Sequence, residues 1–62
     1  MPVIKVDIAK TTKEKKTEMI QKLTKTMSEI TNIPAQAFTV YINEHDTDNI
    51  GVGGVPLSDM HK

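Results

Sequence analysis

The sequence predicts an α/β fold, a single β-α-β unit, on three observations. Two runs of alternating apolar and polar residues stand at about residues 2–8 and 37–43. Between them, the segment from about Lys13 to Thr31 lacks glycine and proline and repeats its apolar residues at helical spacing. The chain has 62 residues, which makes residues 1–62 a single domain. Strand, long helix and strand in this order predict two parallel strands joined by a right-handed crossover.

The first strand is predicted over residues 2–8, which are rich in β-branched side chains. Ile4, Val6 and Ile8 share one face, and the intervening residues share the other. Pro2 can stand at the first position because the start of a strand does not need a backbone N–H. The strand should therefore be half-buried, with its aliphatic face against the helix.

The helix has signals at both ends. Thr11 with Glu14 fits a capping box, and Thr12 could serve as the cap instead. At the far end, Asn32 can adopt a left-handed conformation and Pro34 prevents continuation. One apolar stripe runs along the helix and should pack on the sheet; it consists of Met19, Ile20, Leu23, Met27 and Ile30.

The second strand is predicted over residues 37–43, with Phe38, Val40 and Ile42 on the face toward the helix. Residues 44–49 read as a polar turn or loop. A glycine-rich segment, residues 50–54, follows, then Val55-Pro56-Leu57 and a polar tail that ends at Lys62. No Lys-Ser/Thr pair and no helical pattern come after the glycines, so a phosphate-binding loop is not predicted.

Composition narrows the function classes. The formal net charge is zero, which argues against nucleic acid as a partner because phosphate binding needs a basic excess. Cysteine is absent, and neither the two histidines nor the acidic residues near His45 have metal-site spacing, so we predict no metal and no cofactor. No apolar run reaches membrane-spanning length and no signal peptide stands at the start, so we expect a cytoplasmic protein with no membrane partner.

A two-stranded sheet with one helix is not stable alone. A domain this small buries only roughly 60% of the surface of its unfolded chain. Both outer strand edges and one sheet face would stay open, and Val3, Thr39 and Tyr41 lie on that face. Two chains that pair edge to edge would form a four-stranded sheet with both helices on one face. We therefore expect a homo-oligomer.

The N-terminus carries the feature most suggestive of chemistry. A small second residue favours removal of Met1, and the new terminus would then be the secondary amine of Pro2. A free α-amino group titrates near ~7.7–8.0. Modest burial or a nearby positive charge would lower its pKa into the range where a general base works best.

Together these features resemble the 4-oxalocrotonate tautomerase family, the short-subunit branch of the tautomerase superfamily with an N-terminal proline. The resemblance covers nearly all of the chain. It depends on Met1-Pro2 at the start of a strand, a single long helix to about Asn32, Pro34, a second strand that ends in residues 42–44, and the glycine-rich segment 50–54.

The resemblance implies an oligomer of β-α-β subunits, commonly a hexamer built as a trimer of dimers. Pro2 would be the general base of a tautomerase or isomerase. It would move a proton next to a carbonyl, and so interconvert keto and enol forms or shift a double bond in a small 2-oxo or enolic acid. The glycines would form a short C-terminal hairpin that lies over a neighbouring subunit near the site.

The chain departs from the family at the substrate-binding positions. Members that act on dicarboxylates use two arginines, and this sequence has no arginine. Lys10 and Thr11 stand in the loop before the helix, Thr39 takes the strand position, and Ile50 replaces an aromatic residue. Lys10 could bind one carboxylate as a point charge, but it lacks the bidentate guanidinium geometry. We expect these four residues to contact a different or smaller enolic substrate, or the protein to have low activity on the 2-oxo dicarboxylates that are usual for the family.

Two alternatives remain open at this point. The first is a non-catalytic oligomeric assembly or binding module on the same scaffold, which the missing arginines suggest. The second is hydration or dehalogenation of an unsaturated acid, in which Glu44 or Asp7 would activate water.

Overall fold

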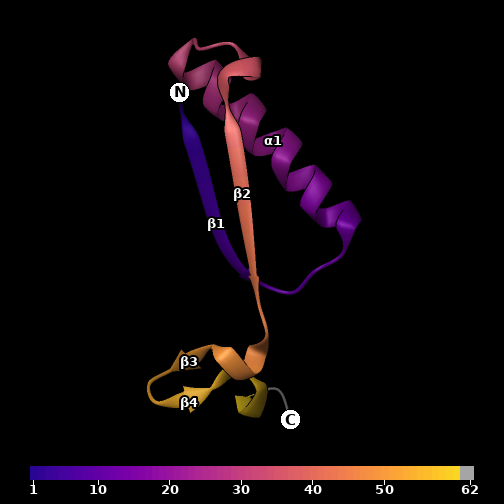
Figure 1. Cartoon of the computed structure of the whole chain (residues 1–62), viewed down its shortest axis with the longest axis vertical. Helices are drawn as coiled ribbons and strands as arrows, with labels where there is room; N and C mark the ends of the chain where they lie inside the picture. The colour runs from indigo at the N-terminus through magenta and orange to yellow at the C-terminus, as the bar shows by residue number, and fades with distance from the viewer. Residues whose placement is uncertain (61–62) are drawn as a thin grey trace.

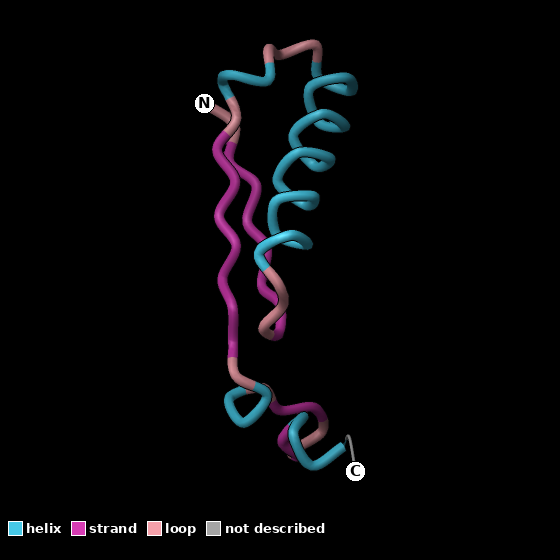
Figure 2. Tube along the Cα trace, turned by 90° about the vertical axis from the view of Figure 1, so that its right-hand side faces the viewer, coloured by secondary structure: helices cyan, strands magenta, loops and turns pink. Residues whose placement is uncertain are grey.

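The computed structural model describes residues 1–60 and confirms the β-α-β unit. Strands β1 (Val3–Ala9) and β2 (Thr39–His45) form a parallel pair, with Val3 opposite Thr39 and Ala9 opposite His45. The connection between them is the helix α1 (Lys13–Thr31), which lies along one face of the pair (Figures 1 and 2). The predicted polar tail falls partly outside the described residues, since His61 and Lys62 are not described.

The strand boundaries differ from the predicted ones. Strand β1 begins at Val3, one residue after Pro2, and extends to Ala9. Strand β2 begins later than predicted because residues 35–37 form the 3-10 turn η1 (Ala35–Ala37). The prediction of a polar loop over residues 44–49 was wrong at its first two residues, because Glu44 and His45 pair with β1. Of the predicted loop, Asp46 and a second 3-10 turn, η2 (Thr47–Asn49), remain outside the strand.

The ends of α1 agree with the sequence signals. Thr12 is the N-cap, and its hydroxyl oxygen accepts a hydrogen bond from the backbone N–H of Lys15 at 3.2 Å. Asn32 ends the helix with φ of 60°, and its N–H donates to the carbonyl of Ser28 at 2.9 Å. Of the two caps that the sequence offered, the structure uses Thr12.

The predicted faces are confirmed for the sheet and only partly for the helix. Ile4, Val6 and Ile8 are half-buried, and their neighbours Val3, Lys5 and Asp7 are exposed. On α1, the half-buried members of the stripe are Met19, Leu23 and Met27. Ile20 and Ile30 remain 42% and 71% exposed. The two strands of one chain are too narrow to cover the whole apolar stripe of α1, so part of it stays exposed.

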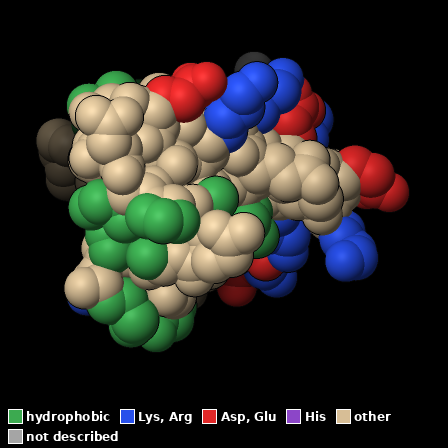
Figure 3. Space-filling model, turned by 90° about the horizontal axis from the view of Figure 1, so that it is seen from above, with side chains coloured by type: hydrophobic (Ala, Val, Ile, Leu, Met, Phe, Trp, Pro, Cys, Tyr) green, Lys and Arg blue, Asp and Glu red, His purple; other side chains and the backbone are tan. Residues whose placement is uncertain are grey.

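A single chain has no closed core. None of the described residues is fully buried. The Cα radius of gyration is 14.7 Å, against about 11 Å for a compact domain of this length. Apolar side chains gather on one side of the view along the long axis, and most charged ones lie on the other (Figure 3). This apolar surface is available for contact with other chains.

The predicted short C-terminal hairpin is present. Strands β3 (Gly51–Val52) and β4 (Val55–Pro56) are antiparallel and are joined by Gly53 and Gly54, with φ of 60° and 84°. Two successive residues with positive φ define the tight turn that glycine favours. The hairpin and the 3-10 turn η3 (Leu57–Met60) stand off the end of β2, away from α1 (Figure 1).

Within the described residues, α1 does not combine the length and hydropathy that a bilayer-crossing helix needs.

Candidate functional site

Pro2 is anchored by its own carbonyl at the start of β1. The carbonyl oxygen of Pro2 accepts a hydrogen bond from the N–H of Thr39 at 3.1 Å. The next residue, Val3, pairs with Thr39 in the strand register. Met1 precedes this anchor and is 91% exposed. The Pro2 ring is therefore held at the end of the sheet where β1 begins, and Met1, which is joined to its nitrogen, projects into solvent.

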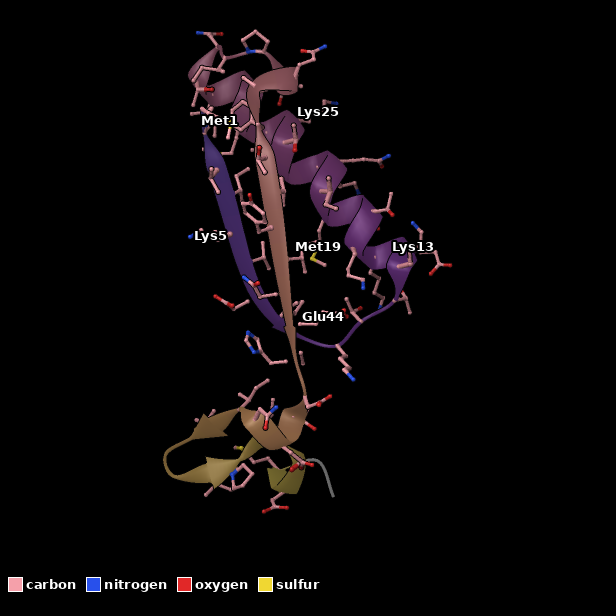
Figure 4. The ribbon with its side chains drawn as sticks, viewed as in Figure 1. Met1, Lys5, Lys13, Met19, Lys25 and Glu44 are labelled. Carbon is pink, nitrogen blue, oxygen red and sulfur yellow. The ribbon has the colours of Figure 1, made fainter. Side chains whose placement is uncertain are left out.

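Thr39 is the only one of the four predicted substrate-binding residues that lies beside Pro2 among the described residues. Lys10 and Thr11 follow β1 at its other end, and Ile50 follows η2 beyond the end of β2. A seven-residue strand separates the two groups, which is about 20 Å at ~3.3 Å per residue. Figure 4 shows Met1 and Glu44 toward opposite ends of the strand pair. One chain therefore holds two halves of the predicted site at opposite ends of its sheet.

Glu44 fixes the loop between β1 and α1. One carboxylate oxygen accepts the N–H of Thr11 at 3.0 Å, and the other accepts from the Lys16 ammonium at 2.9 Å. The hydrogen bond from Lys16, followed by that from the Thr11 backbone, lowers the pKa of Glu44. Sequence reasoning placed Glu44 in a turn and missed this role. Both oxygens have partners, which disfavours Glu44 as a water-activating base.

The pKa shift gives a stability prediction with a definite sign. Folding lowers the pKa of Glu44. Its contacts therefore stabilise the fold at pH values above the pKa of Glu44 in the unfolded chain, about 4.3, and this stabilisation is lost as the pH falls through the lower pKa of the folded chain. We expect Glu44→Gln to lower the unfolding midpoint at neutral pH and to weaken the acid dependence of the wild type. Thermal unfolding from pH 3 to 8 measures both effects.

Glu18→Gln is the matched control for that experiment. Glu18 also has a lowered pKa, but through Lys22 on the same helix. This pair links no separate elements, so its removal should change the midpoint less. Equal midpoints for the two variants at all pH values would show that the Glu44 contacts do not stabilise the loop.

Lys10 is already paired. Its ammonium lies 2.9 Å from a carboxylate oxygen of Asp46, and both side chains are exposed. The hydrogen bond to Asp46 and the charge of that residue raise the pKa of Lys10, so it remains a cation at neutral pH. A substrate carboxylate at Lys10 would compete with Asp46 for this charge.

A hollow of about 250 Å³ lies at the same end of the sheet as Lys10. It is lined by Ile50 together with Asp7, Ile8, Ala9, His45 and Leu57. His45 Nε2 lies 3.0 Å from Oδ1 of Asp7 across the two strands. The sequence placed His45 in a loop, so this pair was missed; the signal that could have found it was the parallel register, which brings the ends of β1 and β2 together.

Two larger hollows border α1. One, of about 500 Å³, lies between the end of β1 and the first half of the helix, and Thr11 lines it. The other, of about 420 Å³, lies along the second half of the helix. Pro2 lines none of these three hollows. Over residues 1–60, no group of His, Cys, Asp or Glu side chains is arranged to hold a metal ion.

The chain matches one known protein family over almost its whole length. The model of that family, described as tautomerase enzyme, matches residues 2–60. A search of curated proteins finds no match. The family match begins at Pro2 and ends with η3, so it includes both halves of the predicted site.

Solved structures give the same result. DmpI from Archaeoglobus fulgidus is 36% identical, with 94% of this chain and 100% of that chain covered and a TM-score of 0.87. YwhB, a homologue of 4-oxalocrotonate tautomerase, is 31% identical over 97% and 100% of the two chains, with a TM-score of 0.88. A 4-oxalocrotonate tautomerase isozyme from Methylibium petroleiphilum is 29% identical over 98% and 100%, with a TM-score of 0.90.

Proposed function

The chain belongs to the tautomerase family, and from this premise we propose that it is an isomerase that moves a proton between carbon and oxygen, or along a double bond, in a small enolic or 2-oxo acid. The observation that carries the proposal is the placement of Pro2. Its carbonyl is fixed to Thr39 and its nitrogen lies at an open edge of the sheet. Removal of Met1 would turn that nitrogen into a pre-oriented secondary amine.

The amine would act as the general base. A proline nitrogen belongs to a ring and has no mobile stem, so little orientation is lost when it meets a substrate. Apolar surroundings supplied on assembly would disfavour its charged form and keep its pKa near neutral. Val3 offers such a surface beside it, since its side chain is exposed in the single chain.

Assembly would complete the site. The two halves of the site lie at opposite ends of one sheet, so a second chain must bring its Lys10 end to Pro2. A two-fold axis makes paired strand edges antiparallel and places the start of one strand beside the end of its partner. We propose such a dimer, and a hexamer of three dimers that also covers the open sheet face.

The substrate would be smaller or less charged than a 2-oxo dicarboxylate. Lys10 is shared with Asp46, Thr11 and Thr39 each offer one hydroxyl, and Ile50 offers an apolar surface. We propose these four side chains as the substrate contacts. One carboxylate can be bound at Lys10, but no second cation stands among them.

The experiment that tests the function is ketonisation of phenylenolpyruvate and of 2-hydroxymuconate, followed by absorbance. We expect a clear rate above buffer for phenylenolpyruvate, which has one carboxylate, and a lower kcat/KM for the dicarboxylate. A rate equal to buffer for both substrates, in protein shown by intact mass to lack Met1, would favour a non-catalytic module.

A further inference from the structure

Among residues 1–60, the hollow beside Ile50 is lined by one acid–base pair and by no lysine. Its lining is aliphatic apart from Asp7 and His45. The nearest cation in sequence, Lys10, is bound to Asp46 and does not line the hollow. Any polar group of a ligand in this hollow would therefore meet the imidazole or the Asp7 carboxylate.

The Asp7 contact defines which imidazole nitrogen is available. Asp7 accepts through Oδ1 at 3.0 Å from His45 Nε2. A carboxylate is an acceptor, so Nε2 carries the hydrogen and Nδ1 holds the lone pair of the neutral ring. The His45 side chain is 43% exposed in the single chain, so a ligand can reach it.

We propose that His45 is a second acid–base residue of the site and that Asp7 is its positioning residue, with Pro2 supplied by a second copy of the chain. This inference rests on the proposed function. It identifies the substrate as a small, largely apolar keto–enol acid whose carboxylate stays at Lys10 outside the hollow, whose keto or enol oxygen lies at His45 and whose apolar part lies against Ile50 and Leu57.

The proton transfers balance without a further reactant. In ketonisation, the enol O–H proton passes to Nδ1 of His45, and the electrons of that bond form the C=O bond. Pro2, the base that removes the C–H proton in enolisation, acts in this reverse direction as its conjugate acid: the electrons of the C=C bond take a proton from the Pro2 ammonium and form the new C–H bond. Pro2 ends as the neutral amine and His45 as the imidazolium that Asp7 stabilises. Proton exchange with water restores both groups.

The charges around His45 fit this role. Asp7 faces it from β1, and Asp46, the next residue along the chain, is paired with Lys10. Glu44 is turned to Lys16 and Thr11. The segments beyond β2 contribute aliphatic Ile50 and Leu57 to the hollow. Among residues 1–60, Asp7 is therefore the carboxylate that bonds the imidazole, and this contact holds the ring in place for the transfer.

The test is the pH profile of kcat/KM for phenylenolpyruvate in wild type, His45→Gln and Asp7→Asn. General acid–base catalysis contributes about 10²–10⁴-fold, so we expect His45→Gln to lose at least ~100-fold in kcat at neutral pH. The His45→Gln variant should also lose the fall in kcat/KM at low pH, because in the wild type a protonated His45 cannot accept the enol proton. Asp7→Asn should retain that fall but have a lower kcat, because the imidazole loses the acceptor that holds its ring. Asp48→Asn, a carboxylate outside the hollow, is the matched control and should behave as wild type.

Two outcomes would overturn the inference. One is an unchanged rate and profile in folded, oligomeric His45→Gln. If that variant does not fold, NMR of wild-type His45 with added phenylpyruvate decides, and an unchanged imidazole resonance at saturation would also overturn it. Either result leaves the Pro2 proposal intact, because loss of activity on blocking the Pro2 nitrogen is measured separately.

Discussion

A chain whose Pro2 nitrogen is acylated is expected to lose about 10²–10⁴-fold in the rate of ketonisation, the contribution typical of one acid–base group. An amide nitrogen has no basic lone pair, so it can neither accept a proton from carbon nor return one. The Pro2 ring and its carbonyl bond to Thr39 stay the same. The change therefore removes the base and leaves the backbone anchor in place.

Chemical synthesis gives the variants directly, since the chain has only 62 residues. The chain that starts at Pro2 is compared with its N-acetyl and N-ethyl forms. The two added groups are similar in size, but only the N-ethyl amine stays basic. We expect the N-ethyl chain to keep more activity than the N-acetyl chain, and Pro2→Ala, which has a primary amine, to lie between wild type and the N-acetyl chain. An N-acetyl chain as active as the free amine would rule out Pro2 as the base.

The second large effect is expected at Tyr41, on the open face of the sheet. Its side chain is 53% exposed in the single chain, and assembly is expected to cover it. Tyr41→Asp would place a carboxylate in that contact and remove an aromatic ring, a loss of about 3–5 kcal/mol for large core side chains. A small domain holds only ~3–5 kcal/mol in its core. We therefore expect the variant to lose both the oligomer and the fold.

Native mass spectrometry and far-ultraviolet circular dichroism measure the two losses together. Gln21→Asp introduces the same carboxylate at an exposed position of α1 and should remain folded and oligomeric. A Tyr41→Asp chain that is a folded monomer would contradict the account, because it would show that a chain with no fully buried residue among residues 1–60 is stable alone.

Most of the fold could be predicted from local signals. The ends of α1 were predicted by Asn32, by Pro34 and by two candidate caps, of which Thr12 is the one used; each acts within a few residues of the boundary it defines. The end of β2 could not be predicted in this way. Glu44 and His45 are polar and resemble a loop, yet they continue the strand because Ile8 and Ala9 stand opposite them.

The candidate site was predictable only in part, for a related reason. Pro2 is marked by its position at the start of the chain, and Thr39 lies beside it through the strand register. The Asp7–His45 pair and the contacts of Glu44 join residues 28 to 38 positions apart. Such pairs depend on which strand ends meet, and side-chain type alone does not specify them. Contacts between chains likewise depend on which surfaces meet on assembly, and side-chain type alone does not specify that either.

The most direct test of the central claim is a titration of the Pro2 nitrogen itself. A synthetic chain that begins at Pro2, with ¹⁵N at that position alone, is followed by NMR from about pH 5 to 9 in the assembled protein, beside the pH profile of kcat/KM. If Pro2 is the group that carries the proton, its resonance titrates at the midpoint of one limb of that profile. A Pro2 nitrogen that titrates well away from the midpoint of either limb would contradict the account.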